Sequence, residues 1–157
     1  KAKYRGSYEE LAAVVASISS APLLELRLFF RMVLANYILC NGDAHAKNFS
    51  MIDADNGAWR IAPVYDVMNT RVHVADEVFA MENGLFKDNG ESPKFRMRDF
   101  FQMWGETIGL SAKLVTIEIR HACDSFASIL NELPSSYMSH KAQSVFRYHV
   151  KQRLLHF

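Results

Sequence analysis

Cysteine, proline and glycine are scarce in this chain of 157 residues, which holds two cysteines, four prolines and seven glycines. The two cysteines, Cys40 and Cys123, lie far apart and form no Cys-x-x-Cys pair, which indicates neither a zinc site nor a disulfide framework. We interpret them as buried, reduced thiols of a cytosolic protein. Because half of the residues are hydrophobic, the composition also excludes a disordered chain and favours helix.

The chain also has no large excess of charge of either sign, since its formal net charge is +1. A near-neutral chain has no global electrostatic footprint for DNA or RNA, so we expect no direct binding of nucleic acid. The most apolar segment, residues 23–40, contains Glu25, Arg27, Arg31 and Asn36, which excludes a membrane span. The chain begins without Met and shows no signal peptide, and we expect it to be a fragment of a longer protein.

Helical periodicity dominates the beginning of the chain. Ser7 followed by Glu10 fits a capping box, and the apolar spacing after it predicts a helix over residues 8–19. A second helix is predicted over about residues 23–40 and is apolar on most of its circumference. A helix of that kind belongs in the middle of a domain, so it would hold the loop that follows it rigidly.

The middle of the chain has a different pattern. Two short β-prone runs, 49–52 and 58–61, flank a turn signal at 53–57, which predicts a small hairpin. Residues 70–98 lack clear periodicity, and we interpret them as an irregular segment of a kind that often carries function.

Helices are predicted again towards the C-terminus, over about residues 100–108, 112–131 and from 140 to the end. The expected capping residues are Asp99, Ser111 and Ser139. The side chains expected in the core are Phe100, Phe101, Trp104, Val145, Tyr148 and Leu155. The predicted fold class is therefore mainly α (α+β): one helical domain over residues 1–157 with a small β-hairpin after its second helix.

A cluster of polar residues interrupts the apolar sequence directly after the second helix. Asp43 and Asn48 lie there five positions apart, and a second carboxylate, Asp66, follows the predicted hairpin. In phosphotransferases a loop carboxylate accepts the proton of the attacking hydroxyl, and an amide five positions later helps to bind magnesium. A further carboxylate is then needed, because Mg²⁺ prefers oxygen ligands. By itself Asn-Gly-Asp is ordinary turn composition, and Asp66 is what favours chemistry over a plain loop.

This order of loop, hairpin and loop is that of the large lobe of protein kinases. The H-R-D and D-F-G motifs are replaced by Asn41-Gly42-Asp43 and Tyr65-Asp66-Val67, which indicates an atypical member. The strings Asn41-x-Asp43-x-His45-x-Lys47-Asn48 and Pro63-x-Tyr65-Asp66 resemble the C-terminal domain of the HipA family of bacterial serine/threonine kinases, of which HipT is a shorter relative. Lys3-Tyr4 and the step of 23 residues from Asp43 to Asp66 agree with that pattern, and the specific matches cover roughly residues 1–75.

The resemblance implies a protein-kinase-like large lobe that uses ATP and Mg²⁺. It makes Asp43 the catalytic base, Asn48 a magnesium ligand and Asp66 the main metal-binding carboxylate. Lys47 is assigned to catalysis, where it would neutralise charge on the transferring phosphoryl group, and His45 to cofactor binding. The spacing leaves a packing role open for both of these residues.

The resemblance also implies a setting, that of a toxin–antitoxin system in the bacterial cytoplasm with a role in persistence. The expected substrate is a protein serine, in an aminoacyl-tRNA synthetase, and the expected partner is a HipB-like DNA-binding antitoxin. In this family the small N-terminal lobe with the phosphate loop lies upstream, and no G-x-G-x-x-G or Walker pattern occurs here. We therefore expect the isolated fragment to be inactive.

Two other functions fit the residues. A small-molecule kinase of the aminoglycoside or choline type also places Asp, His and Asn in such a loop, although those enzymes usually show His-Gly-Asp where this chain has Asn41-Gly42-Asp43. A non-catalytic, kinase-like module that binds a partner is the alternative outside the enzymes.

Overall fold

The computed structural model describes residues 2–53, 57–75, 77–85 and 96–157. Its α-helices are α1 (Tyr8–Ile18), α2 (Pro22–Leu39), α3 (Met97–Thr107), α4 (Ala112–Glu132) and α5 (His140–Leu154). Its strands are β1 (Met51–Asp53) and β2 (Trp59–Ile61), and its 3₁₀ helices are η1 (Ala2–Tyr4), η2 (Ala46–Asn48), η3 (Thr70–Val72) and η4 (Leu133–Ser135). The mainly helical fold class with one small hairpin is confirmed.

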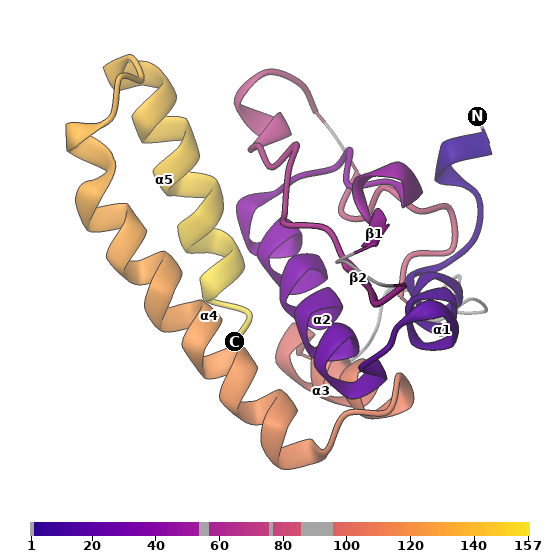
Figure 1. Cartoon of the computed structure of the whole chain (residues 1–157). Helices are drawn as coiled ribbons and strands as arrows, with labels where there is room; N and C mark the ends of the chain where they lie inside the picture. Colours follow the sequence, from indigo (N-terminus) through magenta and orange to yellow (C-terminus); the bar gives the residue numbers. More distant parts are fainter. Residues whose placement is uncertain (1, 54–56, 76, 86–95) are drawn as a thin grey trace.

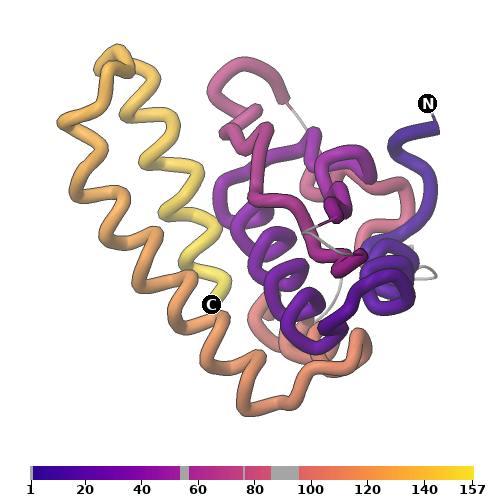
Figure 2. Tube along the Cα trace, viewed as in Figure 1, coloured from indigo at the N-terminus to yellow at the C-terminus, as the bar shows by residue number. Residues whose placement is uncertain are grey.

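Helix α2 lies in the middle of the molecule (Figure 1), with α1 and the hairpin on one side and the antiparallel pair α4–α5 on the other. The chain trace in Figure 2 shows the same arrangement, with α3 near the N-terminal half of α2. Ten of the 18 residues of α2 are buried, as its apolar sequence predicts. In the part of the chain that the structure describes, no helix is long and apolar enough to cross a membrane.

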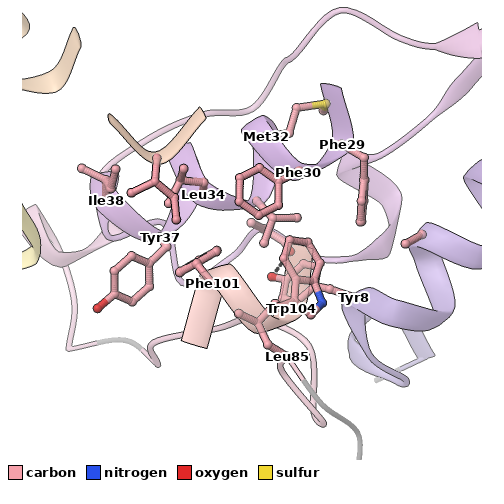
Figure 3. Packing of buried hydrophobic residues seen from close by; sticks show 14 of the residues in the cluster. Tyr8, Phe29, Phe30, Met32, Leu34, Tyr37, Ile38, Leu85, Phe101 and Trp104 are labelled. Carbon is pink, nitrogen blue, oxygen red and sulfur yellow. Dashed lines mark hydrogen bonds between the residues drawn. The ribbon is translucent and has the colours of Figure 1, made fainter. Parts of the chain in front are cut away.

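Aromatic side chains fill the space between α2 and α3 (Figure 3). The ring of Phe30 stacks on Trp104 with centroids 5.5 Å apart, and Phe101 meets both rings edge to face. Phe101 and Trp104 are fully buried and Phe100 nearly so, which confirms the predicted core face of α3. Such a tightly packed aromatic core gives α2 fixed lateral contacts.

The close approach of α3 to its neighbours depends on Gly105. A Cβ atom at this position would lie 2.5 Å from Cγ2 of Val115 and 2.9 Å from Cε2 of Phe30. Alanine is favoured over glycine in helices by about 1 kcal/mol, but overpacking a core costs about 1–3 kcal/mol. We therefore expect Gly105→Ala to lower the free energy of unfolding by about 1–2 kcal/mol in urea denaturation. Ala127→Ser, which adds one heavy atom to an exposed helix position, should change it by less than about 0.5 kcal/mol.

A buried carboxylate joins α2 to α4. Glu118 is 1% exposed and accepts hydrogen bonds from Arg27 (Nε to Oε1, 2.6 Å) and from Arg31. Arg27 and Arg31 lie four positions apart on one side of α2, and this side faces α4. Burial would raise the pKa of Glu118, but the hydrogen bonds and charges of Arg31 and Arg27 outweigh it and hold the pKa below its ordinary value.

This arrangement makes stability depend on pH. Since the folded-state pKa of Glu118 is lowered, its contribution is present above the unfolded value of about 4.3 and is lost as the pH falls through the folded-state value. We expect Glu118→Gln to cost about 2–3 kcal/mol at pH 7 and much less at pH 3, measured by urea denaturation. The exposed Glu132→Gln should cost less than about 0.5 kcal/mol at both pH values, and an equal loss for both variants would contradict this role.

The hairpin is short and is fixed to α2. Its antiparallel register pairs Met51 with Ile61 and Asp53 with Trp59. The buried Oε2 of Glu25, on α2, accepts a hydrogen bond from the N–H of Ile61 at 2.7 Å. The predicted hairpin is confirmed, and residues 54–56 of its turn lie outside the described residues.

The N-terminal caps of three helices follow the prediction. Ser7, Ser111 and Ser139 each accept a hydrogen bond from a backbone N–H of the first turn, and Ser7 with Glu10 completes a capping box. The expected cap at Asp99 is wrong: α3 begins at Met97 after Arg96, and Asp99 lies in its first turn. Of the irregular segment predicted over 70–98, residues 76 and 86–95 lie outside the described residues.

The expected buried face of α5 is also wrong. Tyr148 and Leu155 are 61% and 77% exposed, Val145 is half-buried, and the fully or nearly buried residues are Val150 and Arg153. The guanidinium of Arg153 lies 4.5 Å from the centroid of the Tyr37 ring, and it donates hydrogen bonds to the Tyr37 hydroxyl and to Sγ of Cys40. This stacking contact rotates α5 so that a cation, rather than its tyrosine, faces the end of α2. Cys40 is buried as expected, whereas Cys123 is only partly buried.

Candidate active site

The first loop begins where α2 ends. Cys40 takes the left-handed conformation with φ 58°, and its N–H bonds to carbonyls in the last turn of the helix. The next residue, Asn41, is 4% exposed and its Nδ2 donates to Oδ1 of Asn36 at 2.7 Å and to the carbonyl of Asp66 at 3.2 Å. Its Oδ1 accepts from the N–H of Asp43 at 3.2 Å. One buried amide therefore connects the central helix to both predicted loops.

Thr70 forms a second bridge between the loops. Its Oγ1 donates to the carbonyl of Cys40 and accepts from the N–H of Gly42, each at 3.0 Å. Because these groups are buried, breaking either bond would leave an unsatisfied polar atom in the interior. The two loops thus have a fixed position relative to each other although the hairpin separates them in the sequence.

Asp43 lies at the surface end of this framework. Its side chain is 44% exposed, and its Oδ1 accepts from the Tyr4 hydroxyl at 2.7 Å and lies 3.5 Å from Nζ of Lys3. Tyr4 and Asp43 line a cavity of about 560 Å³. The other residues that line it are Gly42, Met68, Thr70, Val74, Glu77 and Ala80. A carboxylate at the wall of such a cavity is placed to meet a bound group.

Asn48 and Asp66 are in direct contact although 18 positions separate them. Nδ2 of Asn48 donates to Oδ2 of Asp66 at 2.8 Å, and Oδ1 of Asn48 accepts from the N–H of His45 at 2.9 Å. Asp66 takes the left-handed conformation with φ 56°, which is uncommon outside glycine and costs of order 1 kcal/mol. The second loop therefore holds an exposed carboxylate in a strained backbone against a buried amide of the first loop.

The side-chain oxygens of Asn48 and Asp66 are of the kind that Mg²⁺ prefers. The Asp66 carboxylate is exposed, and the amide oxygen of Asn48 keeps a lone pair beyond the one that bonds to His45. Among the described residues no group of three or more His, Cys, Asp or Glu side chains surrounds a common point. One carboxylate and one amide, completed by phosphate oxygens and water, is the kind of site that Mg²⁺ uses with nucleotides.

His45 and Lys47 lie differently. His45 is 7% exposed, its ring meets the ring of Tyr4 edge to face at 5.5 Å, and its carbonyl accepts from the N–H of Asn48. Lys47 is exposed, and its ammonium group forms no ion pair within the described ranges. Its carbonyl accepts a hydrogen bond from the hydroxyl of Tyr65. The burial of His45 favours the packing role that the spacing left open.

Together, a helical lobe with a rigid central helix, a loop with Asp43 and Asn48 at the end of that helix and a loop with Asp66 beside it define the large lobe of a kinase-like fold. Residues 1–143 match the family model HipA_C, described as the HipA-like C-terminal domain, and the chain belongs to this family.

Its relatives bear names of the same kind. The chain is 29% identical over 120 residues to a Haemophilus influenzae protein named "Putative kinase", covering 69% of this chain and 35% of that protein. It is 23% identical over 145 residues to "Putative kinase Y4mE" of Sinorhizobium fredii, covering 88% of this chain and 34% of that protein. The chain thus spans about a third of the length of these relatives.

A solved structure has a similar fold. The HipA of Shewanella oneidensis MR-1, in a toxin–antitoxin complex with HipB and operator DNA, matches with a TM-score of 0.66 at 18% identity. The match covers 96% of this chain and 35% of that one. At this level of identity the likeness is one of fold.

The sequence predicted site roles for Asp43, Asn48 and Asp66, and it gave no role to the residues that hold the two loops together. Asn36, Asn41 and Thr70 carry the bonds between the loops, and Tyr4 contacts Asp43 from the N-terminal segment. Asn41 and Tyr4 are part of the sequence pattern shared with the HipA family, but the pattern gave them no function. Nothing in the spacing of Asn36 and Thr70 signals a contact across the hairpin.

Proposed function

We propose that this chain is the C-terminal catalytic lobe of a HipA/HipT-type serine/threonine protein kinase, which transfers the γ-phosphoryl group of ATP to a protein serine. The observation that carries the proposal is the hydrogen bond between Asn48 and Asp66. Asn48 lies on the same loop as Asp43, and Asp66 lies on the loop after the hairpin. The proposed base, Asp43, and the proposed metal ligands, Asn48 and Asp66, would then be held in a fixed arrangement. Membership of the HipA-like family and relatives that bear kinase names support the same conclusion.

In the proposed reaction Asp43 is the general base. Its carboxylate accepts the proton of the serine hydroxyl while the serine oxygen bonds to the γ-phosphorus, and the bond from that phosphorus to the β–γ bridging oxygen breaks, which leaves ADP. Asn48 and Asp66 would hold Mg²⁺, which when bound would neutralise charge on the phosphate oxygens. Lys47 is exposed and precedes Asn48 in the sequence, and its proposed role is to add a positive charge near the transferring group.

The wider setting belongs to the proposal as well. A HipB-like, DNA-binding antitoxin is the proposed partner, because a HipA of similar fold is found in complex with HipB and operator DNA. An aminoacyl-tRNA synthetase is the proposed substrate and the bacterial cytoplasm the proposed location, both from the resemblance of the motifs. His45 is proposed to shape the nucleotide side of the loop through its packing against Tyr4.

The isolated chain should transfer phosphate negligibly. It spans about a third of its relatives and contains no phosphate-binding glycine loop in its sequence. We expect these 157 residues alone to bind Mg-ATP with a Kd above about 1 mM, a binding free energy weaker than about 4 kcal/mol, in isothermal titration calorimetry. Robust transfer of ³²P from ATP to protein by this chain alone would contradict the expectation.

One experiment separates the proposed function from its alternatives. The full-length parent and its Asp43→Asn and Asp66→Asn variants are expressed, and growth arrest and ³²P transfer from labelled ATP are scored. The proposal predicts labelled phosphoserine in protein and growth arrest with the parent alone. Label in a metabolite and none in protein would indicate a small-molecule kinase. Equal behaviour of all three proteins would indicate a binding module.

A further inference from the structure

The N-terminal segment contributes a side chain to the candidate active site that the proposed reaction does not yet use. The hydroxyl of Tyr4 lies 2.7 Å from Oδ1 of Asp43, the distance of a strong hydrogen bond to a carboxylate. It reaches Asp43 across 39 positions of sequence, so the contact is a product of the fold and not of local geometry. The contact joins the Tyr4 side chain to one oxygen of the Asp43 carboxylate.

The backbone of Tyr4 and of the residues after it is held by a second segment of the chain. Its carbonyl accepts a hydrogen bond from the N–H of Glu82 at 2.7 Å, and the carbonyl of Gly6 accepts from Asn83 at 3.1 Å. Two residues further, the N–H of Tyr8 donates to the carbonyl of Gly84 at 3.0 Å. The segment that carries Tyr4 therefore runs beside residues 82–84 and is anchored before it reaches the loop.

The ring of Tyr4 also has fixed neighbours. It meets the buried ring of His45 edge to face, with centroids 5.5 Å apart, and Nζ of Lys3 lies 4.7 Å from its centroid. The hydroxyl of Tyr4 and, after it, the charge of Asp43 raise the pKa of Lys3. The ring thus contacts both a cation and an imidazole, while its hydroxyl donates to the carboxylate.

These contacts divide the two oxygens of Asp43. Oδ1 receives both the Tyr4 hydroxyl and the Lys3 ammonium, whereas Oδ2 has no hydrogen-bond partner among the described residues. Asp43 also lines the cavity of about 560 Å³, which has room for an acceptor side chain. An oxygen that is not already bonded is the one that can accept a proton from a bound hydroxyl.

We propose that Tyr4 is a positioning residue for phosphoryl transfer, which holds Oδ1 of Asp43 so that Oδ2 faces the acceptor hydroxyl. This inference rests on the proposed kinase function and adds to it a residue from the N-terminal segment. Lys3 contributes less to holding Asp43, because its Nζ lies 3.5 Å from Oδ1. The side chains of Lys3 and Asp43 are also about a third or more exposed to solvent. A misplaced base lowers the rate of the chemical step more than it lowers binding of ATP.

The test uses the full-length parent, labelled ATP and a heat-inactivated lysate of the source cell as the acceptor mixture. Tyr4→Phe keeps the ring and removes the hydroxyl. It should lower the rate at saturating ATP about 10-fold, with KM for ATP changed less than about twofold. Lys3→Gln should lower the rate less than about threefold. Tyr137→Phe, at a fully exposed tyrosine between α4 and α5, should leave it unchanged.

A tyrosine that only supports the fold of the loop should affect stability more than the rate of transfer, and Tyr8 provides this control. The hydroxyl of Tyr8 donates to the carbonyl of Ala44 at 2.8 Å and supports the same loop without touching Asp43. Tyr8→Phe should therefore lower Tm while the rate, measured well below Tm, falls less than about threefold. If Tyr4→Phe keeps a rate within twofold of the parent, or raises KM for ATP as much as it lowers the rate, the positioning role is wrong.

The rates of the Tyr4→Phe and Asp43→Asn variants distinguish a wrong role for Tyr4 from a wrong assignment of the kinase function. Asp43→Asn, measured in the same assay, reports on the function itself. If Asp43→Asn abolishes transfer and Tyr4→Phe does not lower it, the function stands and the role of Tyr4 is overturned. If the parent itself transfers no label to protein, the kinase function is overturned. If Asp43→Asn retains the parent rate, Asp43 is not the base, and the role of Tyr4 falls with it.

Discussion

Asp43→Asn in the full-length parent is expected to lower kcat for phosphoryl transfer by about 10²–10⁴-fold, while KM for ATP changes little. General-base catalysis contributes on this scale, and an amide cannot accept the proton of the serine hydroxyl. Asparagine has nearly the same shape, so the Tyr4 hydroxyl can still donate to its side-chain oxygen. The loss would therefore report on proton transfer and not on the shape of the loop. Initial rates of ³²P transfer at varied ATP measure both constants.

Asp124→Asn provides a matched control. This exposed aspartate lies on α4, and its substitution removes the same charge outside the candidate site. We expect its kcat to be within twofold of the parent. If Asp43→Asn and Asp124→Asn give the same kcat, Asp43 does not act as the base.

The second large effect is expected for Asp66→Asn. The change should weaken binding of Mn²⁺, as a probe for Mg²⁺, to the protein–ATP complex by about 10²-fold, a free energy of about 2.7 kcal/mol. The reason is that Asp66 is the one carboxylate proposed to hold the metal, and Mg²⁺ takes only one or two such ligands from proteins. Electron paramagnetic resonance of free Mn²⁺ during titration measures the affinity without relying on turnover.

Asparagine is the informative substitution at this position because of the backbone. Asp66 has φ 56°, a conformation that Asp and Asn adopt more readily than other non-glycine residues. Asp66→Asn should therefore leave Tm within about 2 °C, which separates metal binding from folding. An unchanged Mn²⁺ affinity, with the fold intact, would remove Asp66 from the metal site.

The parts of the fold that sequence predicts are those fixed by neighbours along the chain. Ser7, Ser111 and Ser139 cap their helices because each needs only a backbone N–H of the next turn. The buried helix α2 follows from its own apolar circumference. At Asp99 a local signal was overruled: α3 begins two residues earlier.

Features that depend on contacts between residues far apart in the sequence could not be predicted from local sequence patterns. The rotation of α5 follows from the stacking of Arg153 on Tyr37, 116 positions apart, so periodicity alone assigned the wrong face. In the site, the spacing selected Asp43, Asn48 and Asp66 as candidates, since their residue types carry the chemistry. It did not select Asn41 or Thr70, whose bonds between the loops exist only in the folded chain.

We propose that the loops with Asp43 and Asp66 together form one metal-dependent phosphotransfer site. Its most direct test is a crystal structure of the full-length parent with Mg²⁺ and a non-hydrolysable ATP analogue. We predict a magnesium ion about 2.0–2.1 Å from both an Asp66 carboxylate oxygen and Oδ1 of Asn48. The acceptor side of the γ-phosphate should face Oδ2 of Asp43. A magnesium–nucleotide complex bound without either of these oxygens as a ligand would contradict the account.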